Sequence, residues 1–209
     1  MAEPDWLTWT RELQAIAQTG LAFTRDAYDR ERYEMLRALA ARMMAAQCDT
    51  PAERIEALFA GEWGYATPKI DVRGAVFDGA GRLLMVREVM DEGRWTLPGG
   101  WADVNLTPAE NVAKEVLEES GYTVRVRKVA GVWDRTRQGH LPAVFACLKL
   151  FFLCDLLGGT GATSLETSGV GWFAEHDLPE DLSLGRVQPG QLRRMFAHWR
   201  EPALPTEFE

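Results

Sequence analysis

The chain has 209 residues, 46% of them hydrophobic, so it is long enough for a sizeable core and too apolar to be a disordered protein. Its formal net charge of −8 provides no basic surface for nucleic acid, so no stable nucleic-acid partner is expected. The three cysteines lack metal-ligand spacing, and we expect reduced thiols in a cytoplasmic protein. No signal-peptide pattern opens the chain, and the longest apolar run, 150–154, is too short to span a membrane.

Helical patterns dominate the first part of the chain. Three segments carry apolar residues at helical spacing or helix-starting residues: Trp6–Ile16, Tyr28–Cys48, and one that starts at 49–51 and ends near Gly61. Residues 61–68 hold two glycines and a proline, which is typical of a linker. We expect a small helical domain over residues 1–66. Because such a domain has little core of its own, it should pack on the second domain or on a partner subunit.

The remainder of the chain, residues 67–209, is expected to form the second domain. Its β-prone runs, separated by turn residues, are 70–77, 82–88, 124–133, 143–154 and 170–174. A closing helix is expected from Val187 or Gln188 to Arg200.

A helix is also predicted over 108–120, between the second and third of these runs. Thr107 is a suitable N-cap, Pro108 fits the first helical position, and Glu110 completes a capping box. Gly121 is the expected stop.

One face of this helix carries three glutamates, Glu115, Glu118 and Glu119, because residues three and four apart meet on a helix surface. Carboxylates this close repel one another unless a cation lies between them, and Mg²⁺ or Mn²⁺ is the natural partner of oxygen ligands. The alternative is a solvated acidic face. The glycine turn at Gly99 and Gly100, just before the helix, favours the metal site.

The region resembles the Nudix hydrolase family, whose motif is a glycine, five residues, a glutamate, seven residues, then Arg-Glu-apolar-any-Glu-Glu-any-Gly-apolar. The matching residues are Gly100, Glu115, Val116, Glu118, Glu119, Gly121 and Tyr122. Leu106 replaces the first glutamate and removes an anchor of the loop, and Lys114 replaces the arginine. Lysine keeps the charge but lacks the planar fork of arginine. Segments 67–77, 83–88, 95–100 and 165–173 are also similar to parts of that fold.

The resemblance implies an α/β/α sandwich with a mixed β-sheet, preceded by a small all-α domain. It implies a Mg²⁺ or Mn²⁺ site formed by the carbonyl of Gly99 with Glu115, Glu118 and Glu119. Family members also place a carboxylate in a late loop, so Glu166 is the candidate catalytic base, with Glu118 as the alternative. The resemblance implies that the added helical domain serves dimerisation or helps to shape the substrate pocket, and a simple stabilising appendage is the alternative. We expect a homodimer.

Six residues are candidate substrate contacts: Arg73, Arg87, Trp133, Asp134, Arg135 and His140. The arginines and the histidine suit phosphoryl oxygens, whereas the tryptophan suits stacking on a base and the aspartate suits hydrogen bonding to the edge of the base. The alternatives are a surface role for the arginines and the histidine, and a hairpin with a packed tryptophan.

The predicted function is Mg²⁺-dependent hydrolysis of a nucleoside diphosphate linked to a second group. By the resemblance, CDP-choline and ADP-ribose are the leading substrates, and the products are a nucleoside monophosphate and a phosphorylated second group. Two alternatives stay open. One is a Nudix-like binding or regulatory module without turnover, and the other is an enzyme acting on other diphosphates or on RNA ends.

Overall fold

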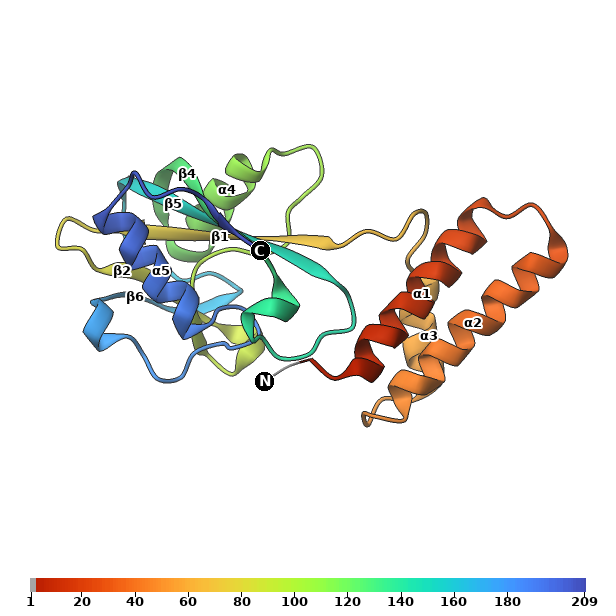
Figure 1. Cartoon of the computed structure of the whole chain (residues 1–209). Helices are drawn as coiled ribbons and strands as arrows, with labels where there is room; N and C mark the ends of the chain where they lie inside the picture. The colour runs from red at the N-terminus through yellow and green to blue at the C-terminus, as the bar shows by residue number, and fades with distance from the viewer. Residues whose placement is uncertain (1–2) are drawn as a thin grey trace. The chain divides into compact units, whose positions relative to one another are not determined.

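The computed structural model describes residues 3–209, which form two compact units (Figure 1). The first unit runs to Pro68 and also takes in Pro142–Ala146, whereas the second comprises Lys69–Leu141 and Cys147–Glu209. Within residues 3–209, no helix is long and apolar enough to cross a membrane.

The first unit is helical, as expected, with α1 (Asp5–Phe23), α2 (Ala27–Ala45) and α3 (Ala52–Ala60) (Figure 1). Asp26 caps α2 by accepting a hydrogen bond from the Asp29 N–H (2.9 Å). The helices enclose a small core of Leu7, Ala40, Ala41, Met44, Ile55 and Phe59.

Residues 143–146 were expected to begin a strand, and this expectation is wrong. Val144 and Phe145 pack against the helical core, and Nε of Arg11 donates to the carbonyl of Ala143 (2.9 Å). Apolar burial by the helices therefore decides the conformation of this segment, and the strand starts only at Cys147.

The second unit is built on a mixed sheet of seven strands. The strands are β1 (Lys69–Phe77), β2 (Leu83–Glu88), β3 (Arg94–Thr96), β4 (Tyr122–Asp134), β5 (Cys147–Gly159), β6 (Thr167–Phe173) and β7 (Glu207–Phe208). The order is β3-β2-β1-β5-β4-β7, with β6 also paired to β2. β1 runs parallel to β5 and β4 runs parallel to β7, whereas the other pairs are antiparallel.

Two helices, α4 (Pro108–Ser120) and α5 (Pro189–Arg200), cover opposite faces of this sheet (Figure 1). Val112 and Val116 of α4 share one core with Val76 of β1, whereas Phe196 of α5 shares another with Phe77. Because adjacent residues of a strand point to opposite faces, these two cores lie on the two sides of the sheet. The predicted α/β/α arrangement with a mixed sheet is confirmed.

Helix α4 begins and ends where the sequence predicts. The Thr107 N–H donates to Oε2 of Glu110 (2.8 Å), and the Glu110 N–H donates back to the Thr107 hydroxyl (3.2 Å). Gly121 ends the helix at a φ of 73°, in the left-handed region that favours glycine.

The short strands β3 and β7 were not predicted, and neither were three 3₁₀ turns: η1 (Val89–Asp91), η2 (Arg135–Gln138) and η3 (Glu175–Asp177). Elements this short carry too few residues for a periodic pattern, so pairing with neighbouring strands and local capping decide them.

Candidate active site

The glycine turn before α4 lies along β1. The Gly74 N–H donates to the carbonyl of Pro98 (2.9 Å), and the Val72 N–H donates to the carbonyl of Gly100 (2.8 Å). Gly99 has a φ of 142°, and a Cβ atom there would lie 2.0 Å from the carbonyl oxygen of Val72. Glycine is therefore required for the turn to approach β1 this closely.

Glu119 is hydrogen-bonded to this turn. Its Oε2 accepts a hydrogen bond from the Gly99 N–H (2.8 Å), and the residue is only 3% exposed. Burial raises the pKa of Glu119 to about 7, although the charge of Arg73 and the bond from Gly99 oppose that rise. The neighbouring charges of Glu115 and Glu88 raise it further.

Glu115 approaches the same turn. A Cβ atom at Gly100 would lie 3.3 Å from both of its carboxylate oxygens. Burial raises the pKa of Glu115, and the charges of Glu118 and Glu166 add to this effect. Two partly desolvated carboxylates thus converge on the Gly99–Gly100 turn, and their mutual repulsion makes the position suited to a cation.

Glu118 and Glu166 are more exposed. Glu118 forms an ion pair with Nζ of Lys114 (3.1 Å), which also pairs with Asp103 (3.1 Å). The backbone of Glu166 is held before β6, where its carbonyl accepts from the Val89 N–H (2.8 Å). The charge of each reaches Glu115, but their assignment as metal ligand and base stays a prediction.

The oxygen atoms at this turn, from glutamate carboxylates and a backbone carbonyl, are chemically suited to a divalent cation. Carboxylate and carbonyl oxygens are the ligands that Mg²⁺ and Mn²⁺ prefer, and crowded carboxylates gain most from such an ion. Across residues 3–209, however, no three His, Cys, Asp or Glu side chains lie close enough together to form a ready-made metal site. The ligand set therefore stays a prediction.

The anchor expected to be missing at Leu106 is supplied by Asn111, which is 1% exposed. Its side-chain oxygen accepts from the Asp103 N–H (2.7 Å). Its amide donates to the carbonyls of Asp103 (3.2 Å), Leu106 (3.4 Å) and Thr107 (3.2 Å). The sequence analysis did not predict this role. The usable signal was a polar amide next to Val112 on the apolar side of the helix, because a buried amide needs hydrogen-bond partners.

Arg73 is placed differently from the expected phosphate contact. It is 3% exposed, and its guanidinium donates twice to Asp71 (2.9 and 2.7 Å) and once to the carbonyl of Leu97 (3.1 Å). Nζ of Lys149 also donates to Asp71 (2.7 Å). Asp71 and Lys149 were not predicted as functional residues, although a charge inside an otherwise apolar strand was a usable signal.

Arg87 is more accessible than Arg73. It pairs with Asp181 (3.0 Å), and its guanidinium carbon lies 5.4 Å from the ring centroid of Trp95. The ion pair is exposed on both sides, so it adds little stability. Its role as a substrate contact stays a prediction.

Trp133 lies in the core and is 2% exposed. Its ring packs against Phe151, with 5.0 Å between ring centroids, and under the guanidinium of Arg194 at 4.8 Å. This is the packed tryptophan of the alternative interpretation, and no ring face is open for stacking on a base.

Asp134, Arg135 and His140 hold the following loop together. Asp134 accepts from the Thr136 N–H (2.7 Å), and Arg135 donates to the carbonyl of Leu141 (2.5 Å). Nδ1 of His140 lies 3.0 Å from the carbonyl of Leu184, and burial together with the charge of Lys149 lowers its pKa to about 4. A neutral, buried His140 does not supply the positive charge expected for a phosphate contact.

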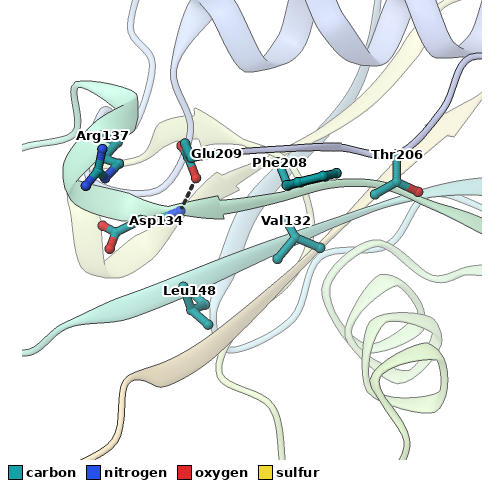
Figure 2. Close-up of a pocket in the computed structure, with 7 residues that line it drawn as sticks. All are labelled: Val132, Asp134, Arg137, Leu148, Thr206, Phe208 and Glu209. Atoms are coloured by element: carbon teal, nitrogen blue, oxygen red, sulfur yellow. Dashed lines mark hydrogen bonds between the residues drawn. The ribbon is translucent and has the colours of Figure 1, made fainter.

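Asp134 also borders a pocket of about 690 Å³ (Figure 2). The lining residues are Val132, Asp134, Arg137, Leu148, Thr206, Phe208 and Glu209. Glu209 closes one side by accepting a hydrogen bond from the Asp134 N–H (2.9 Å) (Figure 2). The lining includes no residue of the Gly99–Glu119 site, and a substrate contact by Asp134 stays a prediction.

The second unit is a mixed sheet between two helical layers, and a glutamate of one helix is hydrogen-bonded to a glycine turn. These features are those of a class of hydrolases. The chain belongs to the Nudix hydrolase family. The family's NUDIX domain model matches residues 67–195, and a model described as a UDP-X-like, N-terminal oligomerisation domain matches residues 4–59.

Named relatives agree. The chain is 45% identical over 207 residues to a putative ADP-ribose pyrophosphatase, YjhB, of Bacillus subtilis, covering 99% of this chain and 98% of that protein. A crystal structure of a UDP-X diphosphatase is 31% identical and covers 100% of both chains, with a TM-score of 0.61. That of an ADP-ribose pyrophosphatase from Streptococcus suis is 37% identical, covers 68% of this chain and 100% of the other, and also has a TM-score of 0.61.

Proposed function

We propose that this Nudix hydrolase cleaves a nucleoside diphosphate linked to a second group, with Mg²⁺ or Mn²⁺ as cofactor. The observation that carries the proposal is the convergence of Glu115 and Glu119 on the Gly99–Gly100 turn, with Glu119 hydrogen-bonded to it at 2.8 Å. The names of the relatives favour ADP-ribose and UDP-linked substrates, and CDP-choline stays a candidate.

The residues that would hold the cation are the Gly99 carbonyl, Glu115 and Glu119, with Glu118 assisting. When bound, the cation neutralises the diphosphate and makes a water molecule more acidic. The chain's own part is to present the donors on a rigid scaffold, since α4 is capped at both ends and the turn is bonded to β1.

In the proposed reaction, water adds its oxygen to one phosphorus and the P–O bond of the anhydride breaks. The second phosphate leaves with the electron pair. Glu166 takes a proton from the attacking water, because its loop position and its electrostatic reach to Glu115 suit that task, and Glu118 is the alternative base. Arg87 is the proposed phosphate contact, since its ion pair is exposed.

We also propose a homodimer formed through the helical unit. Large apolar side chains are exposed along α1 and α2 at intervals of about two turns: Trp9, Ile16 and Phe23 on α1, and Tyr28 and Met35 on α2. Exposed apolar stripes of this kind mark interaction surfaces. The family description of the region as an oligomerisation domain supports a second copy as the partner. The proposed compartment is the cytoplasm, because all three cysteines are free thiols.

Light scattering during size-exclusion chromatography tests the dimer. Wild-type protein should have twice the 23.4 kDa mass of the chain, and Ile16→Glu with Met35→Glu should be monomeric. Leu157→Glu makes the same kind of change at an exposed residue of the second unit and should stay dimeric. A monomeric wild type would refute the dimer.

The function is tested by turnover of ADP-ribose, UDP-sugars, CDP-choline, dinucleoside polyphosphates, nucleoside triphosphates and a capped RNA, read by mass spectrometry with and without Mg²⁺ or Mn²⁺. We expect metal-dependent release of a nucleoside monophosphate, reduced at least about 100-fold by Glu119→Gln. Glu110→Gln is the matched control on the same helix, because glutamine also completes a capping box. Nucleotide binding without product would support the non-catalytic module instead, and turnover only of the capped RNA would support the RNA-end alternative.

A further inference from the structure

The strongest observation outside the glutamates is the buried group of Asp71, Arg73 and Lys149 on β1 and β5. The three residues are 5%, 3% and 1% exposed. Both oxygens of Asp71 are used, since Nε of Arg73 and Nζ of Lys149 donate to Oδ1 (2.9 and 2.7 Å) and a second Arg73 nitrogen donates to Oδ2 (2.7 Å). A two-point Arg–carboxylate pair with this burial has one well-defined geometry.

The remaining arm of Arg73 reaches the glycine turn. Its third nitrogen donates to the carbonyl of Leu97 (3.1 Å), two residues before Gly99. At Gly99 itself, the backbone N–H donates to Oε2 of Glu119 (2.8 Å). Hydrogen bonds therefore run from Lys149 through Asp71 and Arg73 to the carbonyl of Leu97, and two residues further along the backbone the Gly99 N–H is bonded to Glu119 of α4.

The charge of Arg73 also links it to the acidic site. The positive charge of Arg73 attracts the carboxylates of both Glu119 and Glu115. Asp71 in turn occupies two of the guanidinium's donor directions, so that Arg73 is not drawn fully onto those glutamates. Arg73 is thus held beside the acidic site without neutralising it by direct contact.

We propose that Arg73 is a positioning residue: fixed by Asp71 and Lys149, it presets the Gly99 turn and the Glu119 carboxylate for a divalent cation, and it does not bind the substrate. The inference rests on the proposed function, because it assigns the turn to the metal site. Residues that orient metal ligands from behind typically change metal affinity by about 10- to 100-fold when altered.

We expect variants of Arg73 to fold, because Asp71 has a second cationic partner in Lys149. Removing the guanidinium with Arg73→Met leaves Asp71 paired with Lys149 at 2.7 Å, so the buried carboxylate keeps a counter-ion. Arg73→Lys keeps a charge but cannot bond Asp71 at two points and Leu97 at the same time. Arg125→Met is the matched control, because Arg125 forms an exposed Arg–Asp pair with Asp155 (3.0 Å) on the same sheet.

The test is Mn²⁺ binding to the full-length protein without substrate, followed by electron paramagnetic resonance of the free ion. We expect about 10- to 100-fold weaker Mn²⁺ binding in Arg73→Met and in Arg73→Lys, with a wild-type circular dichroism spectrum. Arg125→Met should bind Mn²⁺ as the wild type does. With an active substrate at saturating Mn²⁺, kcat should fall in the Arg73 variants while KM stays within about threefold.

Wild-type Mn²⁺ affinity in both Arg73 variants would overturn the proposal, and a raised KM in the same variants would assign Arg73 to the substrate instead. The proposed function fails separately, if wild-type protein binds Mn²⁺ but turns over none of the substrates. Wild-type protein that binds no Mn²⁺ would overturn both.

Discussion

Buried His140 makes the stability of the protein depend on pH in a predictable way. The side chain is 8% exposed, its Nε2 is buried without a hydrogen-bond partner, and Nδ1 lies 3.0 Å from the carbonyl of Leu184. Because a carbonyl can only accept, Nδ1 carries the proton of the neutral ring. Burial and the charges of Lys149 and Arg135 lower the pKa of His140 to about 4, against the opposing charge of Asp71 and the bond to Leu184.

The sign and the size follow from linkage. Between the unfolded pKa of 6.5 and the folded pKa of about 4, the unfolded chain binds a proton that the folded chain does not, so the free energy of unfolding falls as the pH falls. At about 1.4 kcal/mol per pH unit, the loss attributable to His140 is about 3 kcal/mol. Above pH 6.5 the residue makes no pH-dependent contribution.

The assay is urea unfolding of wild-type protein and His140→Asn from about pH 7.5 to about pH 4. Asparagine keeps a donor for the Leu184 carbonyl but does not titrate. The difference in unfolding free energy between the two proteins should change by about 3 kcal/mol across this range, in favour of the variant at low pH. His176→Asn, at an exposed histidine, is the control and should not show this change. A wild-type curve parallel to that of His140→Asn would refute the reasoning.

Three further predictions concern the α4 region. Gly121→Ala should lower the unfolding free energy by more than about 2 kcal/mol, because the new Cβ would lie 2.5 Å from the carbonyl of Thr160. Gly139→Ala, at the same φ of 73° but with nothing within 4 Å, should cost only about 1 kcal/mol, and equal losses in urea unfolding would contradict the clash. Asn111→Ala should cost about 2–3 kcal/mol and lower kcat, whereas unchanged turnover would show that its loop anchors do not support the site. Lys114→Arg should retain both of its carboxylate partners and at least wild-type kcat, and a loss of turnover would show that the lysine is required.

Local sequence was sufficient to predict helix α4 and its acidic face. The capping box joins Thr107 and Glu110, three positions apart, and Gly121 supplies the stop, so neighbours along the chain decide both ends. The spacing of Glu115 and Glu119 alone places them on one face of the helix. For the same reason the helical character of the first unit was predictable.

Only the tertiary structure decided the burial and the contacts of the residues around the motif. Arg73, Trp133 and His140 were predicted as substrate contacts, yet Arg73 is bonded to Asp71, Trp133 packs in the core, and His140 is buried beside Lys149. The chemical type of a side chain determines what it can bind. Its actual partners, however, come from strands that are far apart in sequence. The free energy of burying a charge or a ring depends on those partners, so only the packed sheet determines which polar residues stay available to a substrate.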